Sequence, residues 1–297
     1  MPPTSATFDE TAYRKRLDDL CARLEQANLR VDSTRLDSYR KTFAKVEKII
    51  SEGRVRQLPD EVDFETLLND LEESQEILEA CDQFSDLSKP GLRDRLEKVL
   101  SGQRELAKES LAKAQARNVL FELVMAARID RAGFGVDLDR IEDVFFDLFG
   151  RPCFVECKRL HSRSKLQTRI DEAAKQIGRR CNDSQSSKAR GIIALDVSKI
   201  ENSGSLLLPC QTEDQVPREV KQHLHAFVIL HKSTPESVRE KRVLGIYVYL
   251  HMPAAILRPI GFRIGKSAVV QILHGPKTKD GQLALKFLRR IQDSEDP

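Results

Sequence analysis

Apolar residues recur at helical spacing through roughly the first 115 residues of the chain. Leu67, Leu71 and Leu78, for example, are four and seven positions apart, which places them on one face of a helix. Gly53 and Pro90 interrupt this pattern and mark connections between helices. The pattern predicts helices at residues 8–28, 33–51, 60–84 and 91–116. We interpret residues 1–115 as an all-α domain, either a helical bundle or a coiled-coil-like arm.

The next apolar stretch, residues 119–127, contains one charged residue, Glu122. A helix with this composition is buried on most sides. A carboxylate inside such a helix needs a partner, a proton or a metal ion, because burying an isolated charge is costly. Glu122 is therefore a candidate functional residue.

Two strand-like segments follow, at residues 141–149 and 153–158, with a turn between them. Side chains alternate between the two faces of a strand, so Glu156 and Lys158 point to the same face. A carboxylate and an ammonium group on an otherwise apolar strand are costly unless they are paired or used.

The pairing of these strands decides whether a third charge joins that face. If residues 150–151 form a two-residue hairpin loop, Asp143 lies opposite Lys158, and Phe145 lies opposite Glu156. The sequence then predicts that Asp143, Glu156 and Lys158 converge on one side of a sheet. A slip of one residue would separate them, so the prediction depends on the register.

The rest of the chain alternates between helical and strand patterns. Residues 166–180 predict an amphipathic helix that carries Arg169, Gln176 and Arg180 on one flank. The apolar run at residues 191–197 is typical of a buried strand. Further strands are predicted at residues 226–231, 243–251 and 267–274, and helices at 216–223 and 282–291. The strand–helix–strand order requires a crossover connection, so we predict an α/β fold with a mixed sheet.

Taken in order, these features resemble the PD-(D/E)XK, or restriction-endonuclease-like, nuclease superfamily. The matching residues are Glu122 on the first helix, Asp143 on one strand, Glu156-Cys157-Lys158 on the next, and Gln176 on the following helix. The resemblance covers about residues 117–200 and a strand-rich remainder to about residue 274. Glu142 stands where the family motif has proline, which is not a ligand in the family. The resemblance implies a restriction-endonuclease-like core over residues 116–280, with a C-terminal helix and tail at 281–297.

The resemblance also implies a metal-dependent deoxyribonuclease that uses Mg²⁺ or Mn²⁺. The catalytic set that it implies is Glu122, Asp143, Glu156, Lys158 and Gln176. Asp143 and Glu156 would be metal ligands, the backbone carbonyl of Cys157 a third, and Glu122 would act directly or through a metal-bound water. Lys158 would position the attacking water or stabilise negative charge, because a lysine beside several carboxylates stays protonated.

The formal net charge of +3 conceals two strongly charged stretches. Residues 60–86 hold eleven acidic residues and no basic ones, whereas residues 158–190 hold ten basic and three acidic ones. A basic stretch beside a carboxylate cluster suits a polyanionic substrate. The phosphate contacts that we predict are Arg159, Arg163, Lys165, Arg169 and Arg180. The alternative is an ordinary solvated helix face.

The acidic stretch should repel nucleic acid. We therefore expect residues 1–115 to contact a protein, either a second copy of the chain or another partner, or to dock on the basic half. The resemblance alone favours DNA over RNA as the nucleic-acid partner.

The composition narrows the class of protein. A chain of 297 residues, 40% hydrophobic and 32% charged, suits two domains of a soluble intracellular protein. No apolar run reaches membrane-spanning length, and the first residues lack a secretory signature. The six cysteines have no disulfide-scaffold spacing, so we expect reduced thiols, no membrane association and a cytoplasmic location.

Cysteine and histidine suggest a metal site only weakly. Cys153, Cys157 and His161 recur every four residues, but four residues of a strand span roughly 13 Å. That distance is too long for two thiolates on one zinc ion, so we interpret the cysteines as buried apolar residues. His223 and His225 would share one face of a strand, where they either bind a metal or are ordinary residues.

The sequence thus favours a metal-dependent nuclease with a family-level role in defence or repair. One alternative is a nucleic-acid-binding or scaffold protein that retains the nuclease fold without cleaving. Another is a helical interaction protein in which the C-terminal half only regulates.

Overall fold

The computed structural model describes residues 10–54, 57–102, 114–140, 143–202, 207–232, 238–258 and 260–295. The chain divides into two compact units. The first unit comprises Met1–Leu120, Gly204–Glu219 and Met252–Gly265, and the second comprises Phe121–Ser203, Val220–His251 and Lys266–Pro297. Within the described residues, no helix is both long and apolar enough to cross a membrane.

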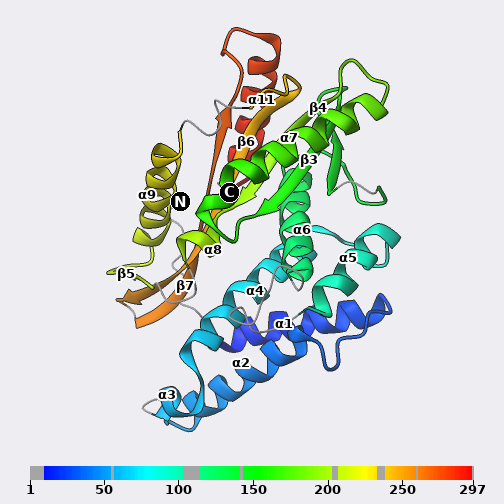
Figure 1. Cartoon of the computed structure of the whole chain (residues 1–297). Helices are drawn as coiled ribbons and strands as arrows, with labels where there is room; N and C mark the ends of the chain where they lie inside the picture. Colours follow the sequence, from blue (N-terminus) through cyan, green and yellow to red (C-terminus); the bar gives the residue numbers. More distant parts are fainter. Residues whose placement is uncertain are drawn as a thin grey trace. The chain divides into compact units, whose positions relative to one another are not determined.

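The N-terminal part of the first unit is helical, as its sequence predicts. Its helices are α1 (Glu10–Gln26), α2 (Arg35–Ser51), α3 (Leu58–Glu61), α4 (Phe64–Gln83) and α5 (Pro90–Leu100). Thr34 caps α2 and Asp63 caps α4 through side-chain oxygens that accept backbone N–H groups. Helices α1, α2 and α4 pack against one another (Figure 1). Their apolar stripes are therefore buried within the unit.

Two of the predicted helices are shorter than the sequence suggests. The expected helix at 60–84 is divided into α3 and α4. The expected helix at 91–116 ends at Leu100, and residues 103–113 lie outside the described part of the chain. Gly102 follows that end, and a Cβ atom there would overlap the Cβ of Ala116. Close packing at Gly102 therefore accompanies the end of α5.

A buried charge network lies inside the first unit. Glu73 accepts hydrogen bonds from Arg35, Tyr39 and Arg117, and all four residues are buried. The distance from Arg35 Nη1 to Glu73 Oε2 is 2.7 Å. Burial is the main cause that raises the pKa of the Tyr39 hydroxyl, and the charge of Glu73 adds to it. One carboxylate thus compensates two buried guanidinium groups.

The described residues form a seven-stranded mixed sheet, which confirms the predicted α/β class. Its strands are β1 (Val136–Asp137), β2 (Val144–Asp147), β3 (Pro152–Arg159), β4 (Arg190–Asp196), β5 (Leu208–Cys210), β6 (Val243–Leu257) and β7 (Ile260–Ile272). The order is β1-β2-β3-β4-β6-β5, and β7 also pairs with β6. Pairs β1–β2 and β2–β3 are antiparallel, whereas β3–β4, β4–β6 and β5–β6 are parallel.

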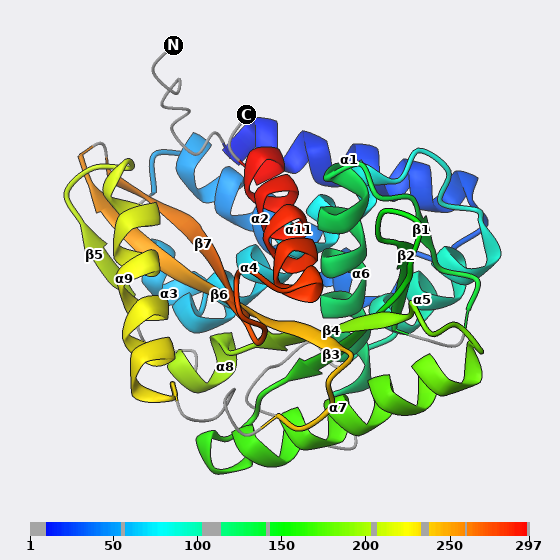
Figure 2. The same ribbon diagram turned by 90° about the horizontal axis from the view of Figure 1, so that it is seen from above.

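Helices cover both faces of the sheet in the second unit. The remaining helices are α6 (Gln115–Arg131), α7 (Leu166–Asp183), α8 (Ser198–Glu201), α9 (Gln215–Leu230) and α11 (Lys279–Glu295). Figure 2 shows α7 on one face of β3 and β4, with α6 and α11 on the other. Phe146 of β2 stacks on Phe287 of α11, and Gly191 of β4 leaves room for Ile177 of α7. These contacts hold α11 and α7 against the sheet, and α7 carries the predicted site residues Gln176 and Arg180.

One predicted strand is wrong. Residues 226–230 continue helix α9, and His231 follows in a turn, so no strand forms at 226–231. His223 and His225 therefore lie on a helix, where positions two apart point in different directions. The proposed shared strand face for these two histidines does not exist.

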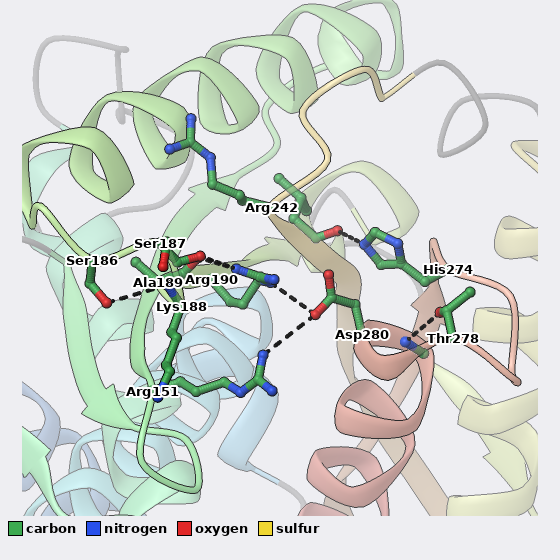
Figure 3. Close-up of polar contacts among 12 residues, drawn as sticks. Arg151, Ser186, Ser187, Lys188, Ala189, Arg190, Arg242, His274, Thr278 and Asp280 are labelled. Carbon is green, nitrogen blue, oxygen red and sulfur yellow. Dashed lines mark hydrogen bonds and ion pairs between the residues drawn. The ribbon is translucent and has the colours of Figure 1, made fainter.

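The C-terminal helix α11 belongs to the second unit, and a side-chain cap and two ion pairs stabilise its first turn. Thr278 Oγ1 accepts the N–H of Gly281 at 3.0 Å, which caps the start of α11. Asp280 Oδ1 lies 2.9 Å from Arg190 Nε and 3.7 Å from Arg151 Nη1 (Figure 3). Asp280 thereby ties α11 to the start of β4 and to the β2–β3 loop.

Candidate functional site

The β2–β3 hairpin sets the arrangement of the candidate site. Phe145 pairs with Phe154, and Asp147 pairs with Pro152. The loop therefore spans residues 148–151, where the N–H of Leu148 donates to the carbonyl of Arg151 at 2.8 Å. Phe149 and Gly150 both have positive φ, as such a reversal requires.

This register corrects the predicted two-residue loop. Phe145 does not oppose Glu156, because the pairing is offset by two residues from the prediction. Continuing the observed register by one pair places Asp143 opposite Glu156 rather than opposite Lys158. An offset of two preserves the face to which each side chain points. Asp143, Glu156 and Lys158 therefore still belong to one face, although their partners differ.

Asp143 lies against the backbone of β3. Its Oδ2 accepts the N–H of Cys157 at 2.9 Å. Asp143 directly precedes Val144, the first residue of β2. The hydrogen bond places the Asp143 carboxylate beside the Glu156-Cys157-Lys158 segment.

Glu156 is the most deeply buried charged residue of the site, with a side chain that is 0% exposed. Lys158 Nζ lies 3.4 Å from its Oε2, and Arg180 of α7 forms an ion pair with its Oε1. The Arg180 contact lacks the direction of a hydrogen bond, so neither Glu156 Oε1 nor Arg180 Nη1 has a hydrogen-bond partner among the residues that the structure describes. The sequence did not predict this ion pair, because it placed Arg180 on a substrate-facing flank.

The electrostatic environment makes Glu156 unusually easy to protonate. Burial is the largest cause, and the negative charge of Asp143 adds to it, so the pKa of Glu156 rises from 4.5 to about 7. Arg180 and Lys158 act in the opposite direction and limit the rise. The two carboxylates thus repel each other at a place where two side-chain cations compensate only in part.

The two remaining predicted catalytic residues lie on the flanking helices. Glu122 of α6 is half-buried. Its charge, with those of Asp143 and Glu156, adds to burial in raising the pKa of the Cys157 thiol. Gln176 of α7 has a buried Oε1 with no hydrogen-bond partner. The Cys157 thiol therefore experiences the charges of all three predicted carboxylates.

Most of the predicted phosphate contacts are engaged within the chain. Arg159 Nε lies 3.1 Å from Asp196, Arg163 Nη2 2.8 Å from Glu201, and Arg169 Nη1 2.8 Å from Glu172. Arg180 is paired with Glu156, and Lys165 is exposed.

The exposed face of α7 offers two basic residues that the predicted set omitted. Lys175 and Arg179 are exposed and lie one helical turn apart. Their spacing opposite the buried Ile170 and Ile177 was a signal in the sequence that would have identified them.

The cysteines behave as apolar residues. All six are free thiols and buried, as the sequence predicts. Burial raises the pKa of the Cys153 and Cys157 thiols well above their usual range. A zinc site at these cysteines is therefore disfavoured.

Among the residues that the structure describes, no three His, Cys, Asp or Glu side chains are grouped so that they hold a metal ion. Two carboxylates that repel each other nevertheless meet at Asp143 and Glu156, and Glu156 Oε1 accepts no hydrogen bond from the described residues. Oxygen donors of this kind are the type that Mg²⁺ or Mn²⁺ prefers. The predicted third ligand, the backbone carbonyl of Cys157, stays a prediction.

The chain matches no protein-family model, and no curated protein or solved structure is significantly similar to it.

Proposed function

We propose that the protein is a metal-dependent nuclease that hydrolyses phosphodiester bonds, with DNA as the favoured substrate. The observation that carries the proposal is the meeting of Asp143 with the Glu156-Cys157-Lys158 segment across the β2–β3 pair. The order of elements adds support: α6, three antiparallel strands, α7 and then the parallel strand β4. This order agrees with the PD-(D/E)XK resemblance of the sequence.

Each residue has a distinct task in this proposal. Asp143, Glu156 and the Cys157 carbonyl hold Mg²⁺ or Mn²⁺, which when bound activates water and offsets charge on the phosphate. Lys158 lies 3.4 Å from Glu156, and its ammonium group stabilises the negative charge that develops during attack. Glu122 orients water, and Gln176 supplies a buried acceptor, Oε1, that accepts no hydrogen bond from the described part of the chain.

The surface of α7 supports a polyanionic substrate. Lys165, Lys175 and Arg179 are exposed, whereas the arginines nearer the sheet are paired with carboxylates. Exposed cations bind phosphates at little cost, because no internal ion pair has to break. We therefore assign phosphate contacts mainly to the exposed face of α7.

A non-cleaving protein with the same fold is the second candidate. Two observations favour it: Lys158 and Arg180 already accompany Glu156, and the described carboxylates form no three-ligand group. In that case the charges only stabilise the hairpin, and the basic face of α7 binds nucleic acid without chemistry. The helical unit as the main interaction surface, with the other unit regulatory, is a third possibility.

A plasmid cleavage assay separates the first two candidates. The full chain should nick or cut DNA with Mg²⁺ or Mn²⁺, and EDTA should abolish the activity. Asp143→Asn and Glu156→Gln should each remove cleavage, whereas Glu172→Gln, an exposed carboxylate on α7, should leave it unchanged. Cleavage at the parental rate by both site variants would exclude this assignment. DNA binding without cleavage by the parent would support the non-cleaving candidate.

A further inference from the structure

The negative charge of Glu156 is compensated in part by two neighbouring cations. Its carboxylate is fully buried, and its two cationic neighbours differ in origin. Lys158 is two residues away on the same strand, and its 3.4 Å contact is to Oε2. Arg180 comes from α7, and its ion pair is to Oε1. Each carboxylate oxygen therefore has one cation beside it.

Arg180 is the neighbour that is easier to displace. Its ion pair lacks hydrogen-bond geometry at both ends, so neither Glu156 Oε1 nor Arg180 Nη1 gains a directed bond. The Arg180 side chain is 19% exposed, and the adjacent residue Arg179 is on the solvent side of α7. A long arginine side chain at such a position can reach water by rotating about its own bonds. Glu156 cannot follow it, because its strand is buried.

An ionised carboxylate that is buried needs a positive charge nearby, since an uncompensated buried charge is strongly unfavourable. Arg180 pairs with the carboxylate that a divalent cation between Asp143 and Glu156 would also contact. Two positive charges beside one carboxylate repel each other. Binding of the cation therefore disfavours the Arg180 ion pair.

We propose that Arg180 is a displaceable counter-ion of Glu156, which compensates the carboxylate when no metal is bound and leaves when a divalent cation binds. This inference rests on the metal site of the proposed function. Arg180 acts through Glu156 and is a positioning residue. Arg180 holds the Glu156 carboxylate in place when no metal is bound. Because the ion pair must break before the metal binds, it weakens metal binding.

The test is a titration of the full chain with Mn²⁺. Calorimetry measures the binding, and the electron paramagnetic resonance signal of free Mn²⁺ measures it independently. All proteins are compared in the same buffer at one fixed pH and one ionic strength. Arg180→Gln should bind Mn²⁺ about tenfold more tightly than the parent, the lower end of the coupling found between close charge pairs. Arg180→Lys, which retains the charge, should stay near the parent.

The matched control is Arg179→Gln, which removes an exposed arginine from the same helix and should leave Mn²⁺ affinity unchanged. In the absence of metal, Arg180→Gln should also unfold at a lower temperature, and saturating Mn²⁺ should restore the parental melting temperature. A merely structural arginine would lower stability without raising affinity for metal. If Arg180→Gln does not fold, Arg180→Met, which keeps a long side chain without its charge, carries the same prediction of tighter Mn²⁺ binding.

The outcomes distinguish the inference from the proposed function. Equal Mn²⁺ affinity in the parent, Arg180→Gln and Arg179→Gln would overturn the counter-ion role and leave the metal site intact. Equal gains in Arg180→Gln and Arg179→Gln would also overturn it, because a general loss of positive charge would then explain the effect. Absence of Mn²⁺ binding in the parent and in every variant would overturn both.

Discussion

Glu156→Gln should change how the stability of the protein depends on pH. In the folded chain the pKa of Glu156 is raised to about 7 from 4.5, first by burial and then by Asp143. The folded protein therefore holds this proton more tightly than the unfolded chain does. The contribution of this proton to the free energy of unfolding is fully present below pH 4.5, and it is lost as the pH rises from there through about 7. Glutamine has no proton to lose, so the variant lacks this contribution.

The size of the effect follows from the difference in pKa. A tenfold change in proton affinity corresponds to about 1.4 kcal/mol. Ionising Glu156 in the folded state should then lower the free energy of unfolding by up to about 3 kcal/mol. This contribution is large beside the total stability of a typical domain, which is about 5–15 kcal/mol.

Urea unfolding of the parent and of Glu156→Gln at several pH values measures the effect. Between about pH 5 and about pH 8, the parent should lose about 3 kcal/mol more than the variant. Millimolar Mg²⁺ should reduce that difference, because a bound cation favours the ionised carboxylate. Equal pH dependence in the two proteins would refute the raised pKa. A parent that gains stability relative to the variant as the pH rises would show that Arg180 and Lys158 outweigh burial.

Three further outcomes are expected. Combining Lys175→Ala with Arg179→Ala should weaken DNA binding and make its affinity less dependent on salt concentration, by about two phosphate contacts. Arg159→Ala, which breaks the pair with Asp196, should leave that salt dependence nearly unchanged. The opposite ranking of these variants in fluorescence anisotropy titrations would place the DNA-binding surface elsewhere. Glu73→Ala should lower the free energy of unfolding by about 3–5 kcal/mol, because it removes the carboxylate to which the buried Arg35 and Arg117 both donate. A loss below about 1 kcal/mol by chemical unfolding would contradict this. Self-association through residues 1–115 stays a prediction, and a full chain that sediments as a monomer at high micromolar concentration would contradict it.

The β2–β3 hairpin shows why the site could be predicted although the register of its two strands was not. The sequence located both strands, but in the structure the segment between them is 148–151, with positive φ at Phe149 and Gly150. Nothing in the pattern distinguishes that loop from a two-residue loop. Both loops contain an even number of residues, so the charged residues keep to one face and the predicted convergence survives.

Helix α9 shows the limit of short apolar runs. Residues 226–231 are apolar enough to suggest a strand, and a run of this length does not by itself distinguish strand from helix. The wider window contains the deciding signal. Val216, Val220, Leu224 and Phe227 are all buried, and they are spaced by four, four and three residues. A longer window would therefore have predicted the helix.

The ion pair between Arg180 and Glu156 lay beyond sequence reasoning. Both residues were identified as site residues, but the sequence gives no distance between a strand and the helix that crosses it. Periodicity placed Arg180 on a flank of α7, and only the packing of α7 on β3 and β4 turns that flank towards Glu156. Partners of buried charges are decided by tertiary packing, whereas faces of helices and strands are decided locally.

A crystal structure of the full chain soaked with Mn²⁺ tests the central claim most directly. Anomalous scattering identifies the ion without reference to activity. The account predicts a single strong peak at roughly 2.0–2.2 Å from a carboxylate oxygen of Asp143 and one of Glu156, with Arg180 moved away from Glu156. A crystal at saturating Mn²⁺ with no peak there, and with Arg180 still paired to Glu156, would contradict it.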